Sequence, residues 1–86
     1  MMFVVEYSHQ ALKFLKKADK ILVERLLRKI EELKTNPVLH DSKTIQGYKE
    51  NLFRVRIGDY RILYEIDYSS NKFGIVKIDK REKVYD

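Results

Sequence analysis

Apolar residues between residues 8 and 37 recur with the spacing of helices. A short β-favouring run over residues 3–7 precedes them. Ser8 and Asp19 offer side-chain oxygens that can accept hydrogen bonds from the first backbone N–H groups of a helix. Pro37 stops the pattern, because proline disfavours helical backbone at the residue before it. The apolar positions that repeat at i, i+3, i+4 and i+7 are Ala11, Leu12, Phe14, Leu15, Ala18, Val23, Leu26, Leu27, Ile30 and Leu33. The pattern predicts an N-terminal strand and then two helices in an antiparallel hairpin.

The hydrophobic period changes from that of a helix to that of a strand after the polar, turn-rich connection of residues 38–50. Alternation of apolar and polar residues indicates strands with one buried face. The strands that it predicts span residues 52–57, 60–68 and 73–78. The order β-α-α-β-β-β predicts a single α+β domain over residues 1–86, in which the helices pack on one face of an antiparallel sheet.

Gly58 and Asp59 fit a two-residue hairpin loop, because glycine supplies a positive φ and aspartate tolerates one. Such a loop places Arg56 directly opposite Arg61 on the non-core face, which also carries Arg54 and is called the arginine face below. Like charges in this position destabilise a sheet by up to about 1 kcal/mol. Two interpretations remain open: the guanidinium groups splay into solvent toward nearby carboxylates, or they converge as a preassembled anion site.

The last strand decides how large this anion site can be. An odd-numbered loop between Tyr68 and Lys72 would put Val76 and Ile78 on the core face. Arg81 would then lie on the arginine face beside the opposed pair. We therefore expect arginines from separate strands to gather on one side of the sheet.

The composition narrows the class of protein. The net charge is +5, from 18 Lys and Arg against 13 Asp and Glu, which suits a nucleic-acid partner because neutralised phosphates release counterions. The chain has no cysteine, which excludes disulfides, thiolate metal sites and cysteine nucleophiles and indicates a reducing compartment. No apolar run approaches the roughly 20 residues that a membrane span needs. We expect a soluble cytoplasmic domain that makes no membrane contact.

The sequence gives little evidence for other kinds of catalytic site. Histidine is the usual base in stand-alone ribonucleases, and neither His9 nor His40 falls on the arginine face. The carboxylates lack the spacing of a metal site, and no glycine-rich phosphate loop is present. The sequence therefore predicts neither a metal nor a cofactor.

The hairpin and the last residues together resemble toxins of the RelE/ParE superfamily. Residues 51–66, NLFRVRIGDYRILYEI, look like the central hairpin of these toxins. Residues 80–85, KREKVY, resemble the end of the RelE branch, where a tyrosine shortly follows a basic residue. The N-terminal strand, the helix pair, the Asn36-Pro37 stop and the Gly47-Tyr48 approach also fit, so that the resemblance covers nearly the whole chain.

The resemblance implies a RelE-like fold and a toxin of a type II toxin–antitoxin pair, which enters the ribosomal A site and cuts the mRNA there without a metal. By position, Arg61 and Arg81 match family residues that stabilise the phosphate and the leaving group, and Tyr85 matches the family's tyrosine. Arg54 and Arg56 stand where well-studied relatives have lysines, one of them a proposed general base. Arginine, with a pKa above about 12, cannot accept a proton at neutral pH, so the proton acceptor stays open.

Metal-free cleavage of RNA uses the neighbouring 2′-OH as nucleophile and gives a 2′,3′-cyclic phosphate. Fixed cationic donors stabilise the charge that grows on the phosphoryl oxygens. Tyr85 would orient the 2′-OH, or act as base if adjacent arginines lower its pKa. The residues that we expect to act in catalysis are Arg56, Arg61, Arg81 and Tyr85. The residues that we expect to bind RNA are Arg54, Arg56, Lys80 and Lys49.

Two alternatives stand beside the ribonuclease. A ParE-like toxin would inhibit a topoisomerase by binding and cut nothing, and a degenerate member would only bind its antitoxin. Either toxin interpretation implies a small RelB-like antitoxin, whose amphipathic helix would wrap the toxin and bury its basic site. Leu52 and Leu63, apolar residues on the arginine face, are expected contacts of that antitoxin. The complex of toxin and antitoxin would bind operator DNA through the antitoxin.

Overall fold

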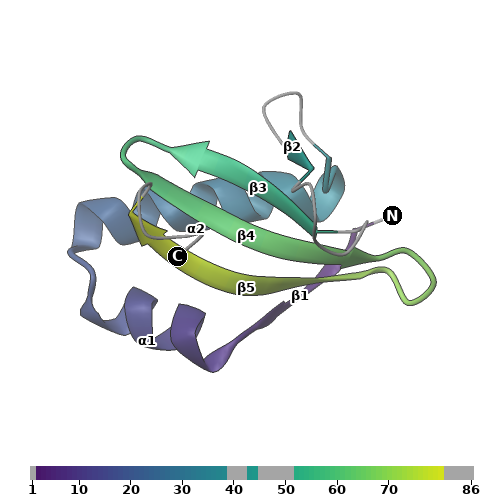
Figure 1. Ribbon diagram of the computed structural model, residues 1–86, viewed down its shortest axis with the longest axis horizontal. Helices are drawn as coiled ribbons and strands as arrows, with labels where there is room; N and C mark the ends of the chain where they lie inside the picture. Colours follow the sequence, from purple (N-terminus) through teal and green to yellow (C-terminus); the bar gives the residue numbers. More distant parts are fainter. Residues whose placement is uncertain (1, 39–42, 45–51, 81–86) are drawn as a thin grey trace.

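The computed structural model describes residues 2–38, 43–44 and 52–80 (Figure 1). The elements are β1 (Val4–Tyr7), α1 (His9–Lys17), α2 (Lys20–Thr35), β2 (Lys43–Thr44), β3 (Leu52–Ile57), β4 (Tyr60–Asp67) and β5 (Lys72–Lys80). The described strands form one sheet in the order β1-β5-β4-β3-β2. The predicted α+β class and element order are confirmed. The two-residue β2 is an addition, since it lies in the segment that was expected to be only a connection.

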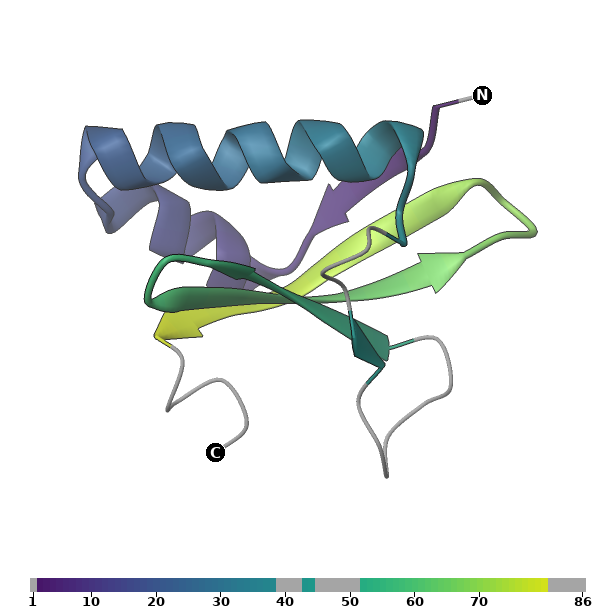
Figure 2. The same ribbon diagram turned by 90° about the horizontal axis from the view of Figure 1, so that it is seen from above.

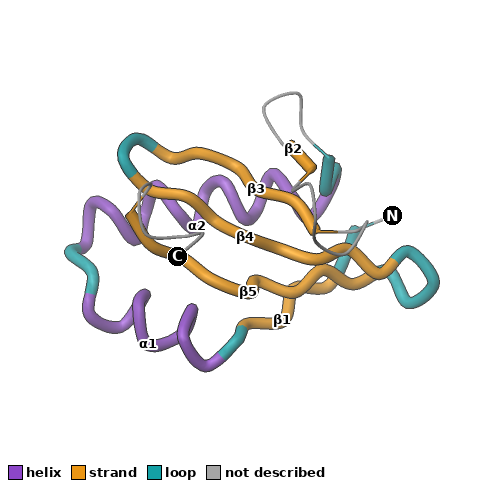
Figure 3. The backbone as a smooth tube through the Cα atoms, viewed as in Figure 1, coloured by secondary structure: helices purple, strands orange, loops and turns teal. Residues whose placement is uncertain are grey.

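Both helices cover the same face of the sheet, as the turned view in Figure 2 shows. They run in roughly opposite directions, with α1 against β5 and α2 behind β3 (Figure 3). The layer between helices and sheet holds the core. Its buried members are Ala11, Leu26, Ile30, Leu33, Val55, Ile57, Ile62, Tyr64, Ile66, Phe73, Ile75 and Ile78. The opposite face of the sheet is the arginine face.

The two helices begin and end where the sequence predicts. The Ser8 hydroxyl accepts a hydrogen bond from the Ala11 N–H at 3.1 Å, and an Asp19 carboxylate oxygen accepts one from the Leu22 N–H at 2.9 Å. After α2, the Tyr64 hydroxyl donates a 2.6 Å hydrogen bond to the Pro37 carbonyl. This buried bond ties the end of the long helix to the middle of the sheet.

The apolar stripes of the helices are narrower than their spacing suggests. Leu12 and Leu27 are 44% and 40% exposed, although both fit the repeat. A helical repeat identifies which direction faces the sheet, whereas the width of the buried stripe depends on how far the sheet extends beneath it.

The hairpin between β3 and β4 has the predicted register. Arg56 pairs with Arg61, and Arg54 pairs with Leu63. Gly58 has a φ of 57°, whereas Asp59 has no positive φ, contrary to the expectation for both loop residues. A positive φ at the first loop residue alone is the pattern of a type II′ turn, which matches the twist of the flanking strands.

The loop before β5 has an even number of residues, which corrects the odd-length loop considered from the sequence. Asp67 pairs with Lys72, so that four residues, 68–71, close the turn. The ladder then shifts by one residue: Tyr64 pairs with Ile75, while the preceding residue of β4, Leu63, pairs with Lys77.

The extra residue in this β-bulge is Val76, which is 37% exposed rather than in the core as predicted. Because a bulge changes the phase of the strand, Ile75 before it and Ile78 after it both reach the core. Ile78 thus lies in the core as predicted, but it does so because of the bulge, which the alternation of the sequence did not predict.

Helix α1 secures the bulged part of β5. β1 runs parallel to β5 and pairs with it only as far as Ile75. Beyond that point the Ser8 hydroxyl donates to the Val76 carbonyl at 2.7 Å. The Gln10 amide then bonds both backbone groups of Ile78, donating to the carbonyl at 2.8 Å and accepting from the N–H at 3.0 Å. A side chain of α1 therefore continues the ladder where β1 ends.

Candidate functional site

The register gathers cationic residues from three strands on the arginine face. Arg54 and Arg56 of β3 lie beside Leu63 and Arg61 of β4, and Lys77 of β5 pairs with Leu63 on the other side. Because side chains alternate between the two faces of a strand, these positions all point away from the helices. The predicted placement of arginines from β3 and β4 on one face of the sheet is therefore confirmed.

The side chains on this face differ in exposure. Arg61 is buried, with 6% of its surface exposed, whereas Arg56 is exposed and Arg54 is half-buried. Leu52 and Leu63 are also buried, at 9% and 8% exposed. Leu52 and Leu63, the leucines expected to contact an antitoxin, are therefore largely covered in this structure.

An acidic residue balances the opposed arginines. In the bulged register Asp79 of β5 pairs with Arg61, whose other neighbour is Arg56 of β3. Opposite charges in cross-strand positions attract, which offsets part of the repulsion between the two guanidinium groups. Sequence reasoning did not weigh Asp79, although the alternation that places Arg81 on the arginine face also places Asp79 there.

Arg56 also belongs to a second feature, a groove of about 250 Å³ between α2 and the hairpin turn. We call it the α2–turn groove. Its lining residues are Arg25, Arg28, Lys29, Glu32, Arg56, Ile57 and Gly58. β2 pairs only with Phe53 and Arg54, so Arg56 can reach around the edge of β3 toward the helix. Sequence reasoning missed Arg25 and Arg28, whose signal is their i, i+3 spacing on one side of α2.

The remaining predicted site residues fall elsewhere. Arg81, Tyr85 and Lys49 lie outside the described residues. Lys80 is exposed at the end of β5, where it pairs with Tyr60. Since Tyr60 points to the helix side of the sheet, Lys80 is not on the face that carries Arg54 and Arg61.

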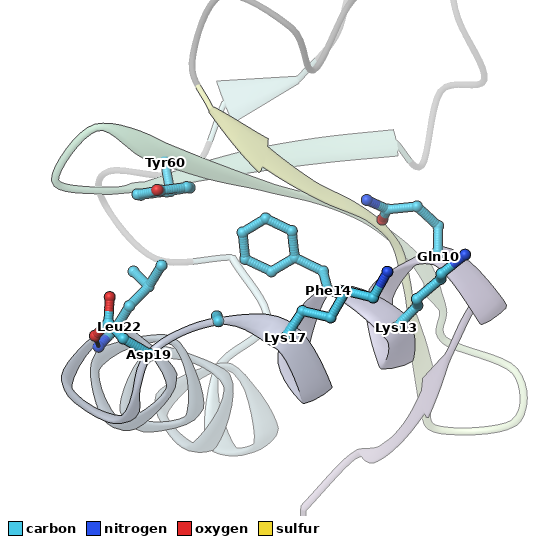
Figure 4. Close-up of a pocket in the computed structure, with 8 residues that line it drawn as sticks. Gln10, Lys13, Phe14, Lys17, Asp19, Leu22 and Tyr60 are labelled. Carbon is cyan, nitrogen blue, oxygen red and sulfur yellow. Dashed lines mark hydrogen bonds between the residues drawn. The ribbon is translucent and has the colours of Figure 1, made fainter.

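A cavity of about 350 Å³ lies on the helix side of the sheet, where α1 meets α2. Figure 4 shows Phe14 and Tyr60 pointing into it from opposite walls, with Lys13 and Lys17 along the α1 side. The two rings meet edge to face with centroids 5.7 Å apart. Leu22 adds a third apolar wall. This cavity suits an apolar group, and it is separated from the arginine face by the sheet itself.

Two groups have displaced pKa values, Asp67 at the end of β4 and Tyr7 at the end of β1. Hydrogen bonds from the Ser69 and Ser70 side chains lower the pKa of the Asp67 carboxyl. Burial raises the pKa of Tyr7, with Glu31 raising it further and Lys34 opposing the change. Both groups act on the stability of the fold.

No group of three or more His, Asp and Glu side chains among the described residues is arranged to hold a metal ion. Within the same residues, no helix is long and apolar enough to span a membrane.

Comparisons with known proteins agree with this geometry. Residues 5–85 match the family described as "ParE toxin of type II toxin-antitoxin system, parDE". The RelE1 toxin candidate of Methanocaldococcus jannaschii is 36% identical over 88 residues, which cover 99% of this chain and 97% of that protein.

Solved structures of RelE toxins are also similar to this chain. RelE in the RelE–RelB complex of Pyrococcus horikoshii superposes with a TM-score of 0.84 at 27% identity, covering 98% of this chain and 100% of that one. The isolated RelE toxin of Escherichia coli has the same fold, with a TM-score of 0.80 at 20% identity over 96% of this chain and 90% of that one. The chain therefore belongs to the RelE/ParE superfamily, and it is a RelE-like toxin of a type II toxin–antitoxin system.

Proposed function

We propose that this toxin is a ribosome-dependent, metal-independent endoribonuclease that cleaves mRNA in the ribosomal A site and so inhibits translation. The observation that carries the proposal is the hairpin register, which brings Arg54, Arg56 and Arg61 together on one face of a RelE-like sheet. Like charges placed opposite one another weaken a sheet, so the arrangement is better explained by an anionic ligand than by stability. The site of action would be the cytoplasm, where ribosomes and mRNA are found.

The proposed reaction is an in-line displacement within the RNA. The 2′-oxygen attacks the adjacent phosphorus, the bond from phosphorus to the 5′-oxygen breaks, and a 2′,3′-cyclic phosphate and a 5′-hydroxyl result. One proton leaves the 2′-oxygen and one is taken up by the departing 5′-oxygen. Arg61 and Arg81 would stabilise the phosphoryl oxygens and leaving group, and Tyr85 would orient the 2′-OH.

The burial of Arg61 supports this role. A side chain that is 6% exposed is held by its surroundings. A cation that is fixed before the reaction needs no reorganisation when charge develops on phosphate, and its field is less screened than in water. Alignment of the 2′-OH by the ribosome would supply a further large share of the rate.

A RelB-like antitoxin would be the partner that controls this activity. The related toxin of Pyrococcus horikoshii was solved as a complex of RelE with RelB. A net charge of +5 suits an acidic antitoxin segment. The complex would reach operator DNA through the antitoxin.

Translation-linked cleavage, mapped by primer extension on a defined mRNA, tests the proposal. Arg61→Gln should lower the cleavage rate by about 100-fold, the order of effect seen when one transition-state donor is removed. Arg54→Gln should lower it less, by roughly tenfold, because its half-buried side chain is assigned to RNA binding. Lys16→Gln, an exposed cation of α1, is the matched control and should cleave as the wild type does.

Thermal unfolding of the same proteins separates a catalytic effect from a folding effect. Arg61→Lys is a further control, because it keeps a cation at this position. Wild-type cleavage rates in both Arg61→Gln and Arg81→Gln would contradict the assigned roles.

The second candidate is ParE-like inhibition of a topoisomerase, which the family match to ParE toxins favours. A toxin of this kind would cut no RNA and would be indifferent to Tyr85→Phe. Inhibition of DNA supercoiling by purified gyrase, together with intact mRNA in the cleavage assay, would select this candidate.

A further inference from the structure

The α2–turn groove joins helix α2, which does not contribute to the arginine face, to the hairpin that carries that face. Arg25 and Arg28 come from α2, and Arg56 and Gly58 come from the β3–β4 hairpin. Arg25, Arg28 and Arg56 are all exposed. None of these three side chains forms a hydrogen bond or an ion pair within the part of the chain that the structure describes.

The one carboxylate that lines the groove is already engaged. Glu32 pairs with Lys29 at 3.6 Å on the same helix. Three guanidinium groups therefore face one groove of about 250 Å³ without a carboxylate of their own. Mutual repulsion of such charges is relieved when an anion enters between them.

The hairpin turn at Gly58 leaves room for the Arg25 side chain close to its backbone. A Cβ atom at Gly58 would lie 3.0 Å from Nη2 and 3.3 Å from Nη1 of Arg25. The glycine thus allows the guanidinium to rest over the hairpin turn, and its φ of 57° disfavours any side chain at this position. Arg25 thus lies against the hairpin turn, in the groove that Arg56 also lines.

We propose that the α2–turn groove binds phosphates of an RNA backbone, as a second RNA-binding surface beside the arginine face. Guanidinium forks match phosphate oxygens in geometry and charge. Arg56 belongs to both surfaces, so a backbone with repeated phosphates can pass from one to the other around the edge of β3. The inference rests on the proposed function in taking RNA as the ligand, and it assigns the groove to affinity rather than to cleavage.

Fluorescence anisotropy with a labelled RNA hairpin whose riboses are 2′-O-methylated tests the groove, because such RNA cannot be cleaved through a 2′-OH. The double variant Arg25→Gln/Arg28→Gln should bind roughly ten- to 100-fold more weakly than the wild type. The slope of log affinity against log salt should fall by about one to two, which is roughly one for each phosphate that the variant no longer neutralises. Arg25→Lys/Arg28→Lys should retain most of the slope.

The matched control is Lys16→Gln/Lys20→Gln, which removes the same charge at exposed positions outside the groove. It should change affinity by less than about threefold, the effect expected of net charge alone. Equal reductions of affinity in the two double variants, or wild-type RNA binding by Arg25→Gln/Arg28→Gln, would overturn the proposal. A reduction confined to binding of an acidic antitoxin peptide would overturn it as well.

The readout separates this inference from the proposed function. A toxin that cleaves mRNA but binds RNA equally with and without Arg25 and Arg28 refutes the groove alone. A toxin that loses RNA affinity in this variant but never cleaves mRNA refutes the ribonuclease alone. Circular dichroism of each variant confirms that the helix is retained.

Discussion

At the scale of single residues, the arginines of this chain have different surroundings, which fit the different roles proposed for them. Arg61 is held in a buried position with Asp79 as its cross-strand neighbour. Arg56 is exposed and reaches the α2–turn groove, where Arg25 approaches it from the helix. A buried guanidinium suits stabilisation of charge at a fixed point, whereas an exposed one suits contact with a mobile phosphate backbone.

Gly58 is the residue at which a small change should have a large effect. Gly58→Ala puts a side chain on backbone with a φ of 57°, which costs about 1–2 kcal/mol of the free energy of unfolding. Gly58→Asn should cost less, because asparagine tolerates this conformation. Urea unfolding of the three proteins measures the difference. Equal stability of the alanine variant and the wild type would mean that the turn has relaxed to another conformation.

At the scale of elements, β5 depends on a side chain of α1 as much as on neighbouring strands. Gln10 bonds both backbone groups of Ile78 and takes the place that a residue of β1 would occupy in a longer strand. The bulge at Val76 and this amide together determine which residues of β5 face Arg61. The composition of the arginine face is therefore set partly from the opposite side of the sheet.

Gln10→Ala should expose this dependence. The backbone N–H and carbonyl of Ile78 would be left without their partners, which should lower the free energy of unfolding by about 1–2 kcal/mol. Hydrogen exchange should show weaker protection of the Ile78 amide, while amides in β3 keep theirs. Lys13→Ala, an exposed change on the same helix, is the control. Unchanged protection at Ile78 would show that the amide adds nothing to the ladder.

The elements that depend on local chemistry were predictable. Ser8 and Asp19 cap their helices by contacts within one turn, and a two-residue loop at Gly58 fixes the register that opposes Arg56 and Arg61. Each of these features is encoded within a few residues of the chain.

The features that depend on distant partners were not predictable. The bulge at Val76 is stabilised by Ser8, 68 residues away, and the α2–turn groove exists only because helix and hairpin meet. Given the four-residue turn before β5, the pairing of Asp79 with Arg61 also depends on that bulge. Hydrophobic alternation carries no information about such contacts, so it misplaced Val76 and overlooked the groove. The catalytic and RNA-binding roles stay predictions for every site residue named from the sequence, which are Lys49, Arg54, Arg56, Arg61, Lys80, Arg81 and Tyr85.

The whole molecule separates its surfaces by chemistry. One side of the sheet carries the arginine face, its edge carries the α2–turn groove, and the helix side holds the apolar cavity around Phe14 and Tyr60. A chain with a net charge of +5 can thus offer two cationic surfaces and one apolar surface at once.

The stability of the whole molecule should be greatest between the titrations of Asp67 and Tyr7. The Asp67 pKa is lowered by its Ser69 and Ser70 hydrogen bonds, so its stabilising contribution is present above the unfolded pKa of about 3.9 and is lost as the pH falls below it. Burial raises the Tyr7 pKa, so the contribution of Tyr7 is present below about 10 and is lost as the pH rises.

Melting temperatures measured from pH 2.5 to 11 check this dependence. The difference between wild type and Asp67→Asn should shrink on acidification, and the wild type should lose more stability than Tyr7→Phe in alkali. Parallel curves for the wild type and either variant would contradict the corresponding assignment.

The pairing of β1 with β5 joins residues that are 68 positions apart. Long-range pairing of this kind slows folding, because a long segment must be closed before the two strands can meet. During synthesis, β1 waits for its partner until residues 72–80 have emerged. An unfinished chain therefore cannot complete the sheet, and the toxin fold forms only after its last strand has been synthesised.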